Sequence, residues 1–476
     1  LAILFIIIVA LAGLGLAVVN ALYKSPWGTF TIAATIPIAL LMGFYLHRVR
    51  PGRIMEVTVI GVVLLLAAVL GGGYVSGSAV EPLFNHNRAF LIWALAIYGF
   101  LASVLPVWML LAPRDYLSTY MKIGTVLILA AGVIFMAPEI HMPAVTKFAG
   151  GGGPIIPGSI FPFMFITIAC GAISGFHSLI SSGTTPKMIE RESDVRLIGF
   201  GAMLCEGFVA IIAIVAATVL IPGDYFAINT RLGADALAAI GFPTARIAEL
   251  SETVGVNVAG RPGGAVSLAV GMAYIFSALP GMKGLMPYWY NFALMFEALF
   301  ILTTVDAGTR VARFILQEFM GKVYKPLGRH NWTPGTIITS AAVVLAWGFL
   351  ITSGSVGTIW PMFGVANQLL AALALSVGTT IIIKMGKVRY AWTTAVPMVF
   401  MFVMTLTASW KLFWLFAARA AASADPSVVF TYRLDAMLVA LMAGLAVVAI
   451  GDSVLKWYGW LAGPEVTVPA EAIDID

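Results

Sequence analysis

Residues 161–187 read FPFMFITIACGAISGFHSLISSGTTPK, and this is the most informative stretch of the sequence. Its first half is apolar, two glycines follow at Gly171 and Gly175, and its second half is rich in serine and threonine. Glycines weaken a helical hydrogen-bond ladder at a depth where lipid cannot replace the lost bonds, so such a break is tolerated only where the freed backbone is buried or lines a cavity. Discontinuous helices of this kind form the substrate sites of many secondary transporters. We therefore predict a broken transmembrane helix over residues 159–182.

The second half of this segment is the candidate substrate site. Its N-terminus would present the positive end of the helix dipole and free backbone N–H groups to an anion. We predict that a substrate carboxylate is bound here by Gly171, Ser174, Gly175, His177 and Ser178. Small residues four apart also let two helices pack closely, so helix packing alone is the alternative. An intramembrane histidine is a natural proton carrier, although it can also simply hydrogen-bond a neighbour.

The composition of the whole chain places this segment in a polytopic membrane protein. Of its 476 residues, 61% are hydrophobic and 10% are charged, against about 45–50% and about 25% in soluble domains. These values exclude a cytosolic enzyme, a secreted disulfide scaffold and a disordered regulator. The net charge of +5 fits Lys and Arg held in cytoplasmic loops. We therefore expect the lipid bilayer as a partner and no nucleic acid.

The apolar runs are too long and too continuous for alternating barrel strands, so we predict an all-α membrane protein. The blocks expected to be helical are 1–23, 27–46, 54–72, 89–112, 123–137, 159–182, 198–221, 264–280, 288–305, 336–353, 359–383, 391–417 and 430–451. Basic residues follow the second, fourth and sixth blocks, and the positive-inside rule places these loops in the cytoplasm. The basic loop after 288–305 obeys the same rule only if 264–280 is re-entrant or packed on the outer face. We therefore predict about twelve transmembrane helices.

The stretch 222–263 differs in kind, because charged residues alternate there with small apolar ones. We expect short amphipathic helices on the outer surface, which form either a solvated loop or a lid over an extracellular vestibule. The predicted organisation is a transporter core over 1–320 that contains this lid, C-terminal transmembrane helices over 330–455 and a cytoplasmic tail over 456–476.

Carboxylates at membrane depth are candidates for ion coupling, because a charge there is costly unless it is paired, protonated or hydrated. Glu297 lies in the middle of block 288–305, and Thr303, Thr304 and Asp306 could supply oxygen ligands to a small cation or pass on protons. We predict these four residues as the coupling site for a proton, with sodium as an alternative. The competing interpretation of Asp306 is that it caps the helix end and pairs with Arg310 four residues later.

Several other polar residues are interpreted as structural. Arg114 and Asp115 follow Pro113, which we expect to end a helix, so they should order a cytoplasmic loop, although inner gates use the same chemistry. Asn367 and Gln368 follow a second broken segment and are expected to join neighbouring helices by hydrogen bonds.

The sequence contains no phosphate-binding loop, no HExxH sequence and no Cys/His cluster with zinc spacing. We therefore expect no cofactor and no metal, and any transport must use an ion gradient. Ser174 and His177 could mimic a nucleophile and its base, but no third group orients them. An intramembrane hydrolase, or another membrane-embedded enzyme, is the alternative function. Glu206 is interpreted as a structural partner.

Six strings together resemble the carbon starvation protein A family of bacterial inner-membrane transporters over essentially the whole chain. They are KSPWGT at 24–29, RPGRIME at 50–56, LPVWMLLAPRDYLS at 105–118, GAISGFH at 171–177, SSGTTPK at 181–187 and VDAGTR at 305–310. The resemblance implies uptake of peptides during carbon starvation, and some members of the family are pyruvate/proton symporters. It also implies a core of two five-helix inverted repeats, in which 159–182 is the first helix of the second repeat. The matching helix of the first repeat would then precede residue 1, so this sequence departs from the family by lacking the expected N-terminal helices.

Overall fold

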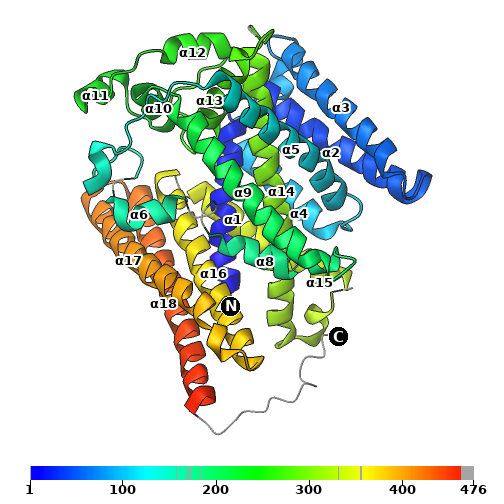
Figure 1. Cartoon of the computed structure of the whole chain (residues 1–476), viewed down its shortest axis with the longest axis vertical. Coiled ribbons are helices and arrows are strands. Elements are labelled where there is room, and N and C mark those ends of the chain that lie inside the picture. The colour runs from blue at the N-terminus through cyan, green and yellow to red at the C-terminus, as the bar shows by residue number, and fades with distance from the viewer. Residues whose placement is uncertain are drawn as a thin grey trace.

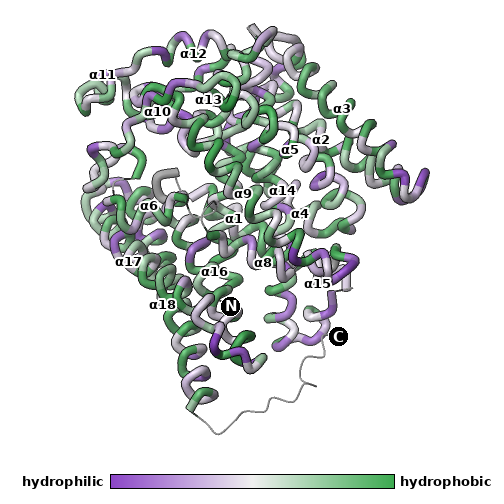
Figure 2. The backbone as a smooth tube through the Cα atoms, in the orientation of Figure 1, coloured by the Kyte–Doolittle hydropathy of each residue, from purple (hydrophilic) through white to green (hydrophobic). Residues whose placement is uncertain are grey.

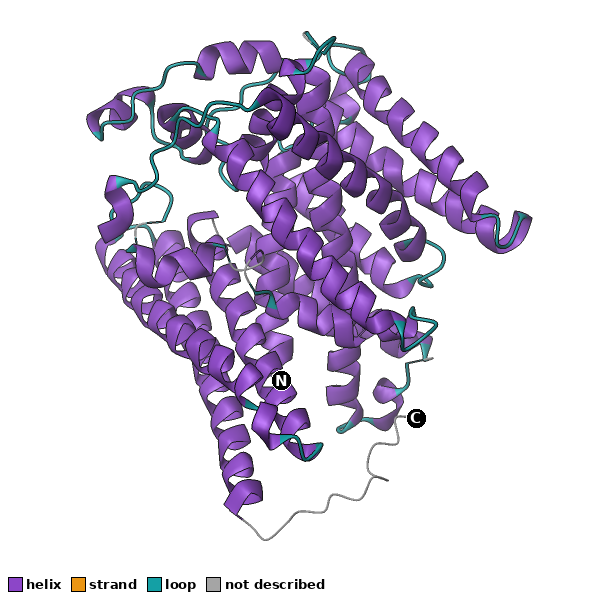
Figure 3. Cartoon of the chain, in the orientation of Figure 1, coloured by secondary structure: helices purple, strands orange, loops and turns teal. Residues whose placement is uncertain are grey.

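The computed structural model describes residues 2–156, 158–168, 171, 173–183, 185–282, 284–330, 332–353 and 356–462, and of residues 187 and 356–358 it describes the backbone only. Within these ranges the regular structure is entirely helical (Figure 3). This confirms the all-α prediction.

Ten of the described helices are long and apolar enough to cross a membrane. They are α1 (Ala2–Leu22), α2 (Pro26–Phe44), α3 (Ile54–Val75), α5 (Leu111–Met136), α9 (Asp194–Thr218), α14 (Met286–Gly321), α15 (Thr333–Ser353), α16 (Val356–Lys384), α17 (Trp392–Ala422) and α18 (Pro426–Ala462). Two shorter apolar helices are α4 (Arg88–Val104) and α13 (Ala265–Ala278). Hydrophobic residues run along the long helices and hydrophilic ones gather mainly in the connecting segments (Figure 2). The chain is therefore a multi-pass membrane protein.

Helix α1 runs through the middle of the bundle (Figure 1, blue) and packs against α14, α15 and α16. Its small residues allow this close packing, because a Cβ atom on Gly13 would lie 2.5 Å from the Phe363 side chain, and one on Gly15 would lie 2.7 Å from that of Ile351. By contrast, only Ile212 and Ala216 of α9 are buried, and the helix carries large apolar side chains such as Phe200 and Ile211 on its surface. Such an exposed apolar helix is suited to contact with lipid.

The structure corrects the expected boundaries around Pro113. Helix α4 ends at Val104, because Pro106 disfavours a helical conformation at the preceding residue Leu105, whose ψ is 151°. Helix α5 begins at Leu111, so Pro113 lies in its first turn, where a missing backbone N–H costs nothing. The prediction that Pro113 ends a helix is therefore wrong, and Arg114 belongs to a helix.

The structure also corrects the segment after residue 305 and the start of the tail. Helix α14 continues to Gly321, so Arg310 and Arg313 lie on a helix and are buried instead of standing in a loop. Helix α18 continues to Ala462. Residues 463–476 of the expected tail lie outside the described residues.

Helix α13 is short and lies beside the beginning of α14. Its 14 residues cover about 21 Å, against a hydrocarbon thickness of about 30 Å. Just before α13, Arg261 donates a hydrogen bond to the Tyr290 hydroxyl at 3.1 Å. Near its end, Phe276 contacts Trp289 with ring centroids 5.1 Å apart. Arg261, before α13, and Phe276, near its end, thus contact neighbouring residues close to the start of α14.

Three short helices lie between α9 and α13, where short helices were expected: α10 (Pro222–Asn229), α11 (Ala234–Ala239) and α12 (Ile247–Val254). They gather at one end of the bundle (Figure 1). The Asp224 carboxylate organises this segment by accepting hydrogen bonds from the backbone N–H groups of Ala245 and Arg246, at 2.9 and 3.0 Å. On the surface, hydrogen bonds from Arg246 lower the pKa of Glu249 below its usual value.

Candidate functional site

The segment over 159–182 is interrupted, as the sequence predicts. Helix α6 (Ile160–Thr167) ends before the break, and α8 (Gly175–Gly183) begins after it. Between them, Ile168 accepts a hydrogen bond from the Gly171 N–H at 2.9 Å, and residues 173–174 are not helical. Residues 169, 170 and 172 lie outside the described residues.

The start of α8 lies directly on the backbone of α16. A Cβ atom on Gly175 would lie 2.1 Å from the Ala371 nitrogen and 2.3 Å from the Asn367 carbonyl oxygen. On the α6 side, a Cβ atom on Gly364 would lie 2.4 Å from the Ile166 carbonyl oxygen. Only glycine permits such close approach of two backbones. The break therefore also serves helix packing, which was the alternative to a binding site.

Two amide side chains of α16 hold the two halves of the broken helix. Asn367 Oδ1 accepts hydrogen bonds from the Phe176 N–H at 2.8 Å and from the Ser174 hydroxyl at 3.2 Å. Gln368 Nε2 donates to the Phe165 carbonyl oxygen at 3.2 Å. Both residues are buried, so the expectation that they join helices is confirmed. The expected second break is wrong, because α16 is one helix over Val356–Lys384. Asn367 acts as an N-cap supplied by another helix, because it satisfies a backbone N–H that the first turn of α8 leaves unpaired.

The structure brings the predicted substrate residues together around the first turn of α8. The Ser174 hydroxyl accepts a hydrogen bond from the His177 backbone N–H at 3.4 Å, and the Ser178 hydroxyl donates to the Gly175 carbonyl oxygen. The His177 imidazole faces Glu206 of α9, with Nδ1 3.3 Å from the carboxylate. If Ser174 and His177 acted as a nucleophile and its base, the Ser174 hydroxyl would contact the imidazole. The hydrogen bond between these two residues instead uses the His177 backbone N–H. Glu206 has the partner role expected of it.

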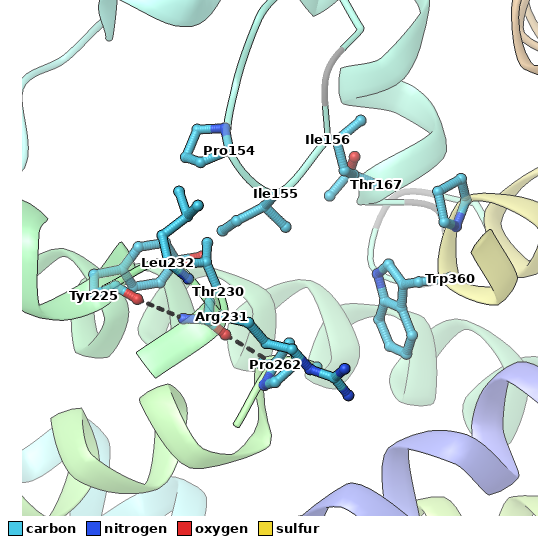
Figure 4. A pocket seen from close by; sticks show the side chains of 14 residues that line it. Pro154, Ile155, Ile156, Thr167, Tyr225, Thr230, Arg231, Leu232, Pro262 and Trp360 are labelled. Carbon is cyan, nitrogen blue, oxygen red and sulfur yellow. Dashed lines mark hydrogen bonds between the residues drawn. The ribbon is translucent and has the colours of Figure 1, made fainter. Parts of the chain in front are cut away.

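A cavity of about 540 Å³ adjoins the break (Figure 4). Thr167 at the end of α6 and Trp360 of α16 line one side of it, and Tyr225 and Thr230 of the short-helix segment line another. Arg231 extends from that segment towards the side on which Trp360 lies (Figure 4). The cavity combines apolar and aromatic walls with a few polar groups, which is typical of a small-molecule site.

Asp306 lies in the interior of α14, where it is 1% exposed and contacts two other helices. The Tyr98 hydroxyl of α4 donates a hydrogen bond to Asp306 Oδ2, and Arg114 Nη1 of α5 lies 3.5 Å from the same oxygen. Arg114 itself is fully buried, stacks on the Tyr98 ring at 4.5 Å and donates to the Thr35 hydroxyl of α2 at 3.3 Å. A buried ion pair therefore joins four helices at this point.

This arrangement corrects the alternative interpretation of Asp306. The carboxylate does not cap a helix end, because α14 continues for 15 residues to Gly321. The Arg310 guanidinium instead donates to the carbonyl oxygens of Ala102 and Leu105, at the end of α4. The expectation that Arg114 orders a cytoplasmic loop is wrong as well. The missed partners Tyr98 and Arg114 are 208 and 192 residues before Asp306, and nothing in the local sequence signals such a pairing.

The four predicted coupling residues do not form one cluster. Glu297 lies nine residues before Asp306, about 14 Å along a helix. The hydroxyls of Thr303 and Thr304 both donate to the Phe300 carbonyl oxygen at 3.0 Å. Among the described residues, no group of three or more His, Cys, Asp or Glu side chains could hold a metal ion.

Glu297 is the more isolated of the two carboxylates. Its Oε2 atom is buried and has no hydrogen-bond partner in the described part of the chain. A carboxylate in such surroundings is costly to keep charged, and a proton on it removes this cost.

Comparison with known proteins places this geometry in context. A model of the carbon starvation protein CstA family matches residues 1–408. The peptide transporter CstA of Bacillus subtilis is 43% identical over 471 residues, which cover 99% of this chain and 77% of that protein. The peptide transporter CstA of Escherichia coli is 48% identical over 85% of this chain, and the pyruvate/proton symporter BtsT of the same organism is 44% identical over 86%. No solved structure is significantly similar.

The chain spans only part of the length of these relatives. It covers 61% of Escherichia coli CstA and 62% of BtsT. The matched regions contain the interrupted helix and the buried Asp306–Arg114 pair, since the family match extends from residue 1 to residue 408.

Proposed function

This chain belongs to the carbon starvation protein CstA family, and on this basis we propose that it forms most of a proton-coupled transporter in the bacterial inner membrane, which imports peptides, pyruvate or both. The relatives' names supply the substrates and the proton. The interrupted helix α6–α8, with its cavity of about 540 Å³, is the observation on which the proposal rests. A cavity at a helix break is a costly feature for a protein whose only task is to pack helices.

The proposed membrane topology has twelve crossings. The ten long helices, α4 and the α6–α8 pair, counted as one span, give this number: 10 + 1 + 1 = 12. The short length of α13, 14 residues, supports leaving it out of the count. The proposal also includes the inverted-repeat core and the cytoplasmic position of the C-terminal end. It further includes additional N-terminal helices, and the greater length of the relatives supports this last part.

The segment 222–263 is proposed as a lid over an outer vestibule. Tyr225, Thr230 and Arg231 of this segment line the cavity opposite Thr167 and Trp360. The lid therefore lies between the cavity and the outer solution in the proposed topology, and its movement would open or close access to the broken helix.

The proposed substrate site is the first turn of α8. Ser174, His177 and Ser178 supply hydroxyl and imidazole groups, and Gly171 allows close approach of the backbone to a carboxylate. Gly175 begins the turn, and the α16 backbone fills the space beside its Cα atom. Asn367 already accepts a hydrogen bond from the Phe176 N–H, so a bound carboxylate would have to use the neighbouring groups or displace this side chain. Pyruvate and a peptide both carry a carboxylate, and this chemistry suits either.

Glu297 and Asp306 are the proposed coupling residues, with Thr303 and Thr304 between them. A proton on Asp306 would remove its attraction to Arg114, and the ion pair that joins α14 to α5 would weaken. Protonation could thus bias the position of α14, which contacts α8, and so link a proton to the substrate site. Sodium as the coupling ion is the second arm of the test.

Uptake into liposomes tests this proposal directly. The natural polypeptide that contains these residues is reconstituted under an imposed pH gradient or sodium gradient, and labelled pyruvate and a labelled dipeptide are followed in parallel. We expect uptake driven by the pH gradient, and its loss in Glu297→Gln and Asp306→Asn but not in Glu318→Gln on the same helix. Uptake of neither solute by folded protein would refute the transporter proposal, and uptake driven by sodium alone would refute proton coupling.

A further inference from the structure

A second cavity, of about 580 Å³, lies at the end of the bundle that carries the proposed lid. The turn between α1 and α2, the segment from α3 to α4 and the segment 255–262 surround it. Its charged lining residues are Lys24, Glu81, Arg88, Arg231 and Arg261. We refer to it as the basic cavity.

The charges around the basic cavity are unbalanced. Four cations and one carboxylate give a formal charge of +4 − 1 = +3. The carboxylate is engaged within its own loop, where Glu81 accepts hydrogen bonds from the Gly77 N–H at 2.7 Å and from Asn85 Nδ2 at 3.5 Å. No ion pair joins Lys24, Arg88 or Arg231 to an acidic residue in the described part of the chain. Such a concentration of one sign of charge in a cavity attracts counter-ions.

The three arginines have different surroundings. Arg261 is structural, because its guanidinium donates to the carbonyl oxygens of Ala21 and Tyr23, at the end of α1, and to the Tyr290 hydroxyl. By contrast, Arg88 Nη2 is buried and has no hydrogen-bond partner among the described residues. A buried guanidinium donor without a partner is costly. Arg88 lines the basic cavity, so a shift of its guanidinium towards an anion there would give this donor an acceptor.

Arg231 connects the basic cavity to the cavity beside the helix break. It lines both, as does Pro262. Its side chain extends towards Trp360 (Figure 4). An anion bound in the basic cavity would therefore have a cation on the wall that this cavity shares with the cavity beside the helix break.

We propose that the basic cavity is a binding site for the carboxylate group of an incoming solute, held by Arg88 and Arg231, outside the cavity at the helix break. Guanidinium groups bind carboxylates through two parallel hydrogen bonds. A carboxylate should therefore bind more tightly than a simple inorganic anion of the same charge. This inference rests on the proposed function for the identity of the solute, since pyruvate and a peptide C-terminus are both carboxylates. The binding site itself can be tested without transport.

A cysteine introduced into the basic cavity reports its electrostatic potential. Both native cysteines, Cys170 and Cys205, are replaced by alanine, and Ser76→Cys, a nearly isosteric change of a lining residue, provides the probe. Asn257→Cys is a second probe in case the first variant does not fold. The rates of modification by an anionic and a cationic methanethiosulfonate are compared in purified protein without any ion gradient. Ala421→Cys, which is exposed at the end of α17, is the control position.

We expect the ratio of anionic to cationic rates to exceed that of the control position by on the order of 10-fold at low salt, because the cavity concentrates anions. Arg231→Gln should reduce the ratio by about 3- to 10-fold, whereas Arg433→Gln, at an exposed arginine on α18 that does not line the cavity, should leave it unchanged. Pyruvate and a dipeptide should slow the modification, while pyruvamide and an amidated dipeptide should not.

Three results would overturn the proposal. They are equal rate ratios at the probe and control positions, equal effects of Arg231→Gln and Arg433→Gln, and protection by chloride at the same concentration as pyruvate. These outcomes are separate from the liposome result. Selective protection without uptake would support the binding site and refute the proposed transport. Uptake without selective protection would support transport and refute the binding site.

Discussion

Replacing Gly175 by alanine tests whether the contact between α8 and α16 positions the broken helix. The added Cβ atom would lie 2.1 Å from the Ala371 nitrogen and 2.4 Å from the Leu370 carbonyl carbon. Both atoms belong to the backbone of a long helix, so no side-chain rotation can relieve the overlap. To reach an ordinary contact of 3.4 Å, α8 must move away from α16 by about 1.3 Å, the difference between 3.4 and 2.1 Å.

The cost of this displacement can be estimated from its parts. Overpacking costs about 1–3 kcal/mol, and loss of the hydrogen bond from the Phe176 N–H to Asn367 Oδ1, now 2.8 Å, costs about 1 kcal/mol. The higher helix propensity of alanine returns about 1 kcal/mol. The net destabilisation is therefore about 1–3 kcal/mol. With an unfolding entropy of about 1 kcal/mol/K for 476 residues, the melting temperature should fall by about 1–3 °C.

Thermal unfolding in detergent at one fixed scan rate measures this effect, with Gly201→Ala as the matched control. Gly201 lies inside α9 and has nothing within 4 Å of the position of a Cβ atom, so alanine there should be neutral or stabilising by up to about 1 kcal/mol. We also expect Gly175→Ala to lose substrate uptake and Gly201→Ala to retain it. If Gly175→Ala melts at or above the temperature of the control, the close contact does not constrain the helix break and the reasoning fails.

Three further predictions follow from the ion pairs and the proposed lid. Arg114→Gln or Asp306→Asn alone should each destabilise the protein by about 3–5 kcal/mol, because a buried charge loses its partner. The double variant should recover part of this loss in the same melting assay. A double variant whose destabilisation equals the sum of the two single effects would contradict the pairing. Asp224→Asn should weaken the acceptor for the two backbone N–H groups before α12. The rate of proteolysis in segment 222–263 should therefore rise by several-fold. An unchanged cleavage pattern would show that this carboxylate does not organise the segment. Hydrogen bonds from Arg246 lower the pKa of Glu249. Its stabilising effect is therefore complete above the ordinary glutamate value of about 4.3 and is lost as the pH falls through the lower folded value. Amide protection factors in α12, from which the intrinsic pH dependence of exchange is removed, should fall at acidic pH more in the wild type than in Glu249→Gln, and identical pH profiles would contradict this.

The course of the polypeptide through the membrane is largely predictable from local composition. Long apolar runs, a glycine-rich interruption and the spacing of basic residues are one-dimensional signals, and the helices follow them closely. The largest errors arose at Pro113 and after residue 305. Proline both ends a helix and begins one, so the residue type alone does not decide between these roles. After residue 305, the basic residues predict a loop, whereas Arg310 and Arg313 are buried in α14.

The candidate site is predictable only in part. The helix break and the amide side chains that hold it were found from sequence, because glycines and polar residues in an apolar run are visible locally. The basic cavity was not, since Lys24, Arg88 and Arg231 come from three distant segments. Their charges are individually ordinary on the outer surface, and they form a feature only when the chain brings them to one cavity.

An all-helical membrane protein with an interrupted helix over 159–182 can be predicted from the amino-acid sequence, because burial in lipid depends on runs of consecutive residues and a break in a helix depends on the residues within it. Which charged groups meet follows from helix packing. Asp306 contacts Tyr98 and Arg114, not the nearby Arg310, because an ion pair depends on the distance between side chains in space, and helix packing sets that distance independently of separation along the chain.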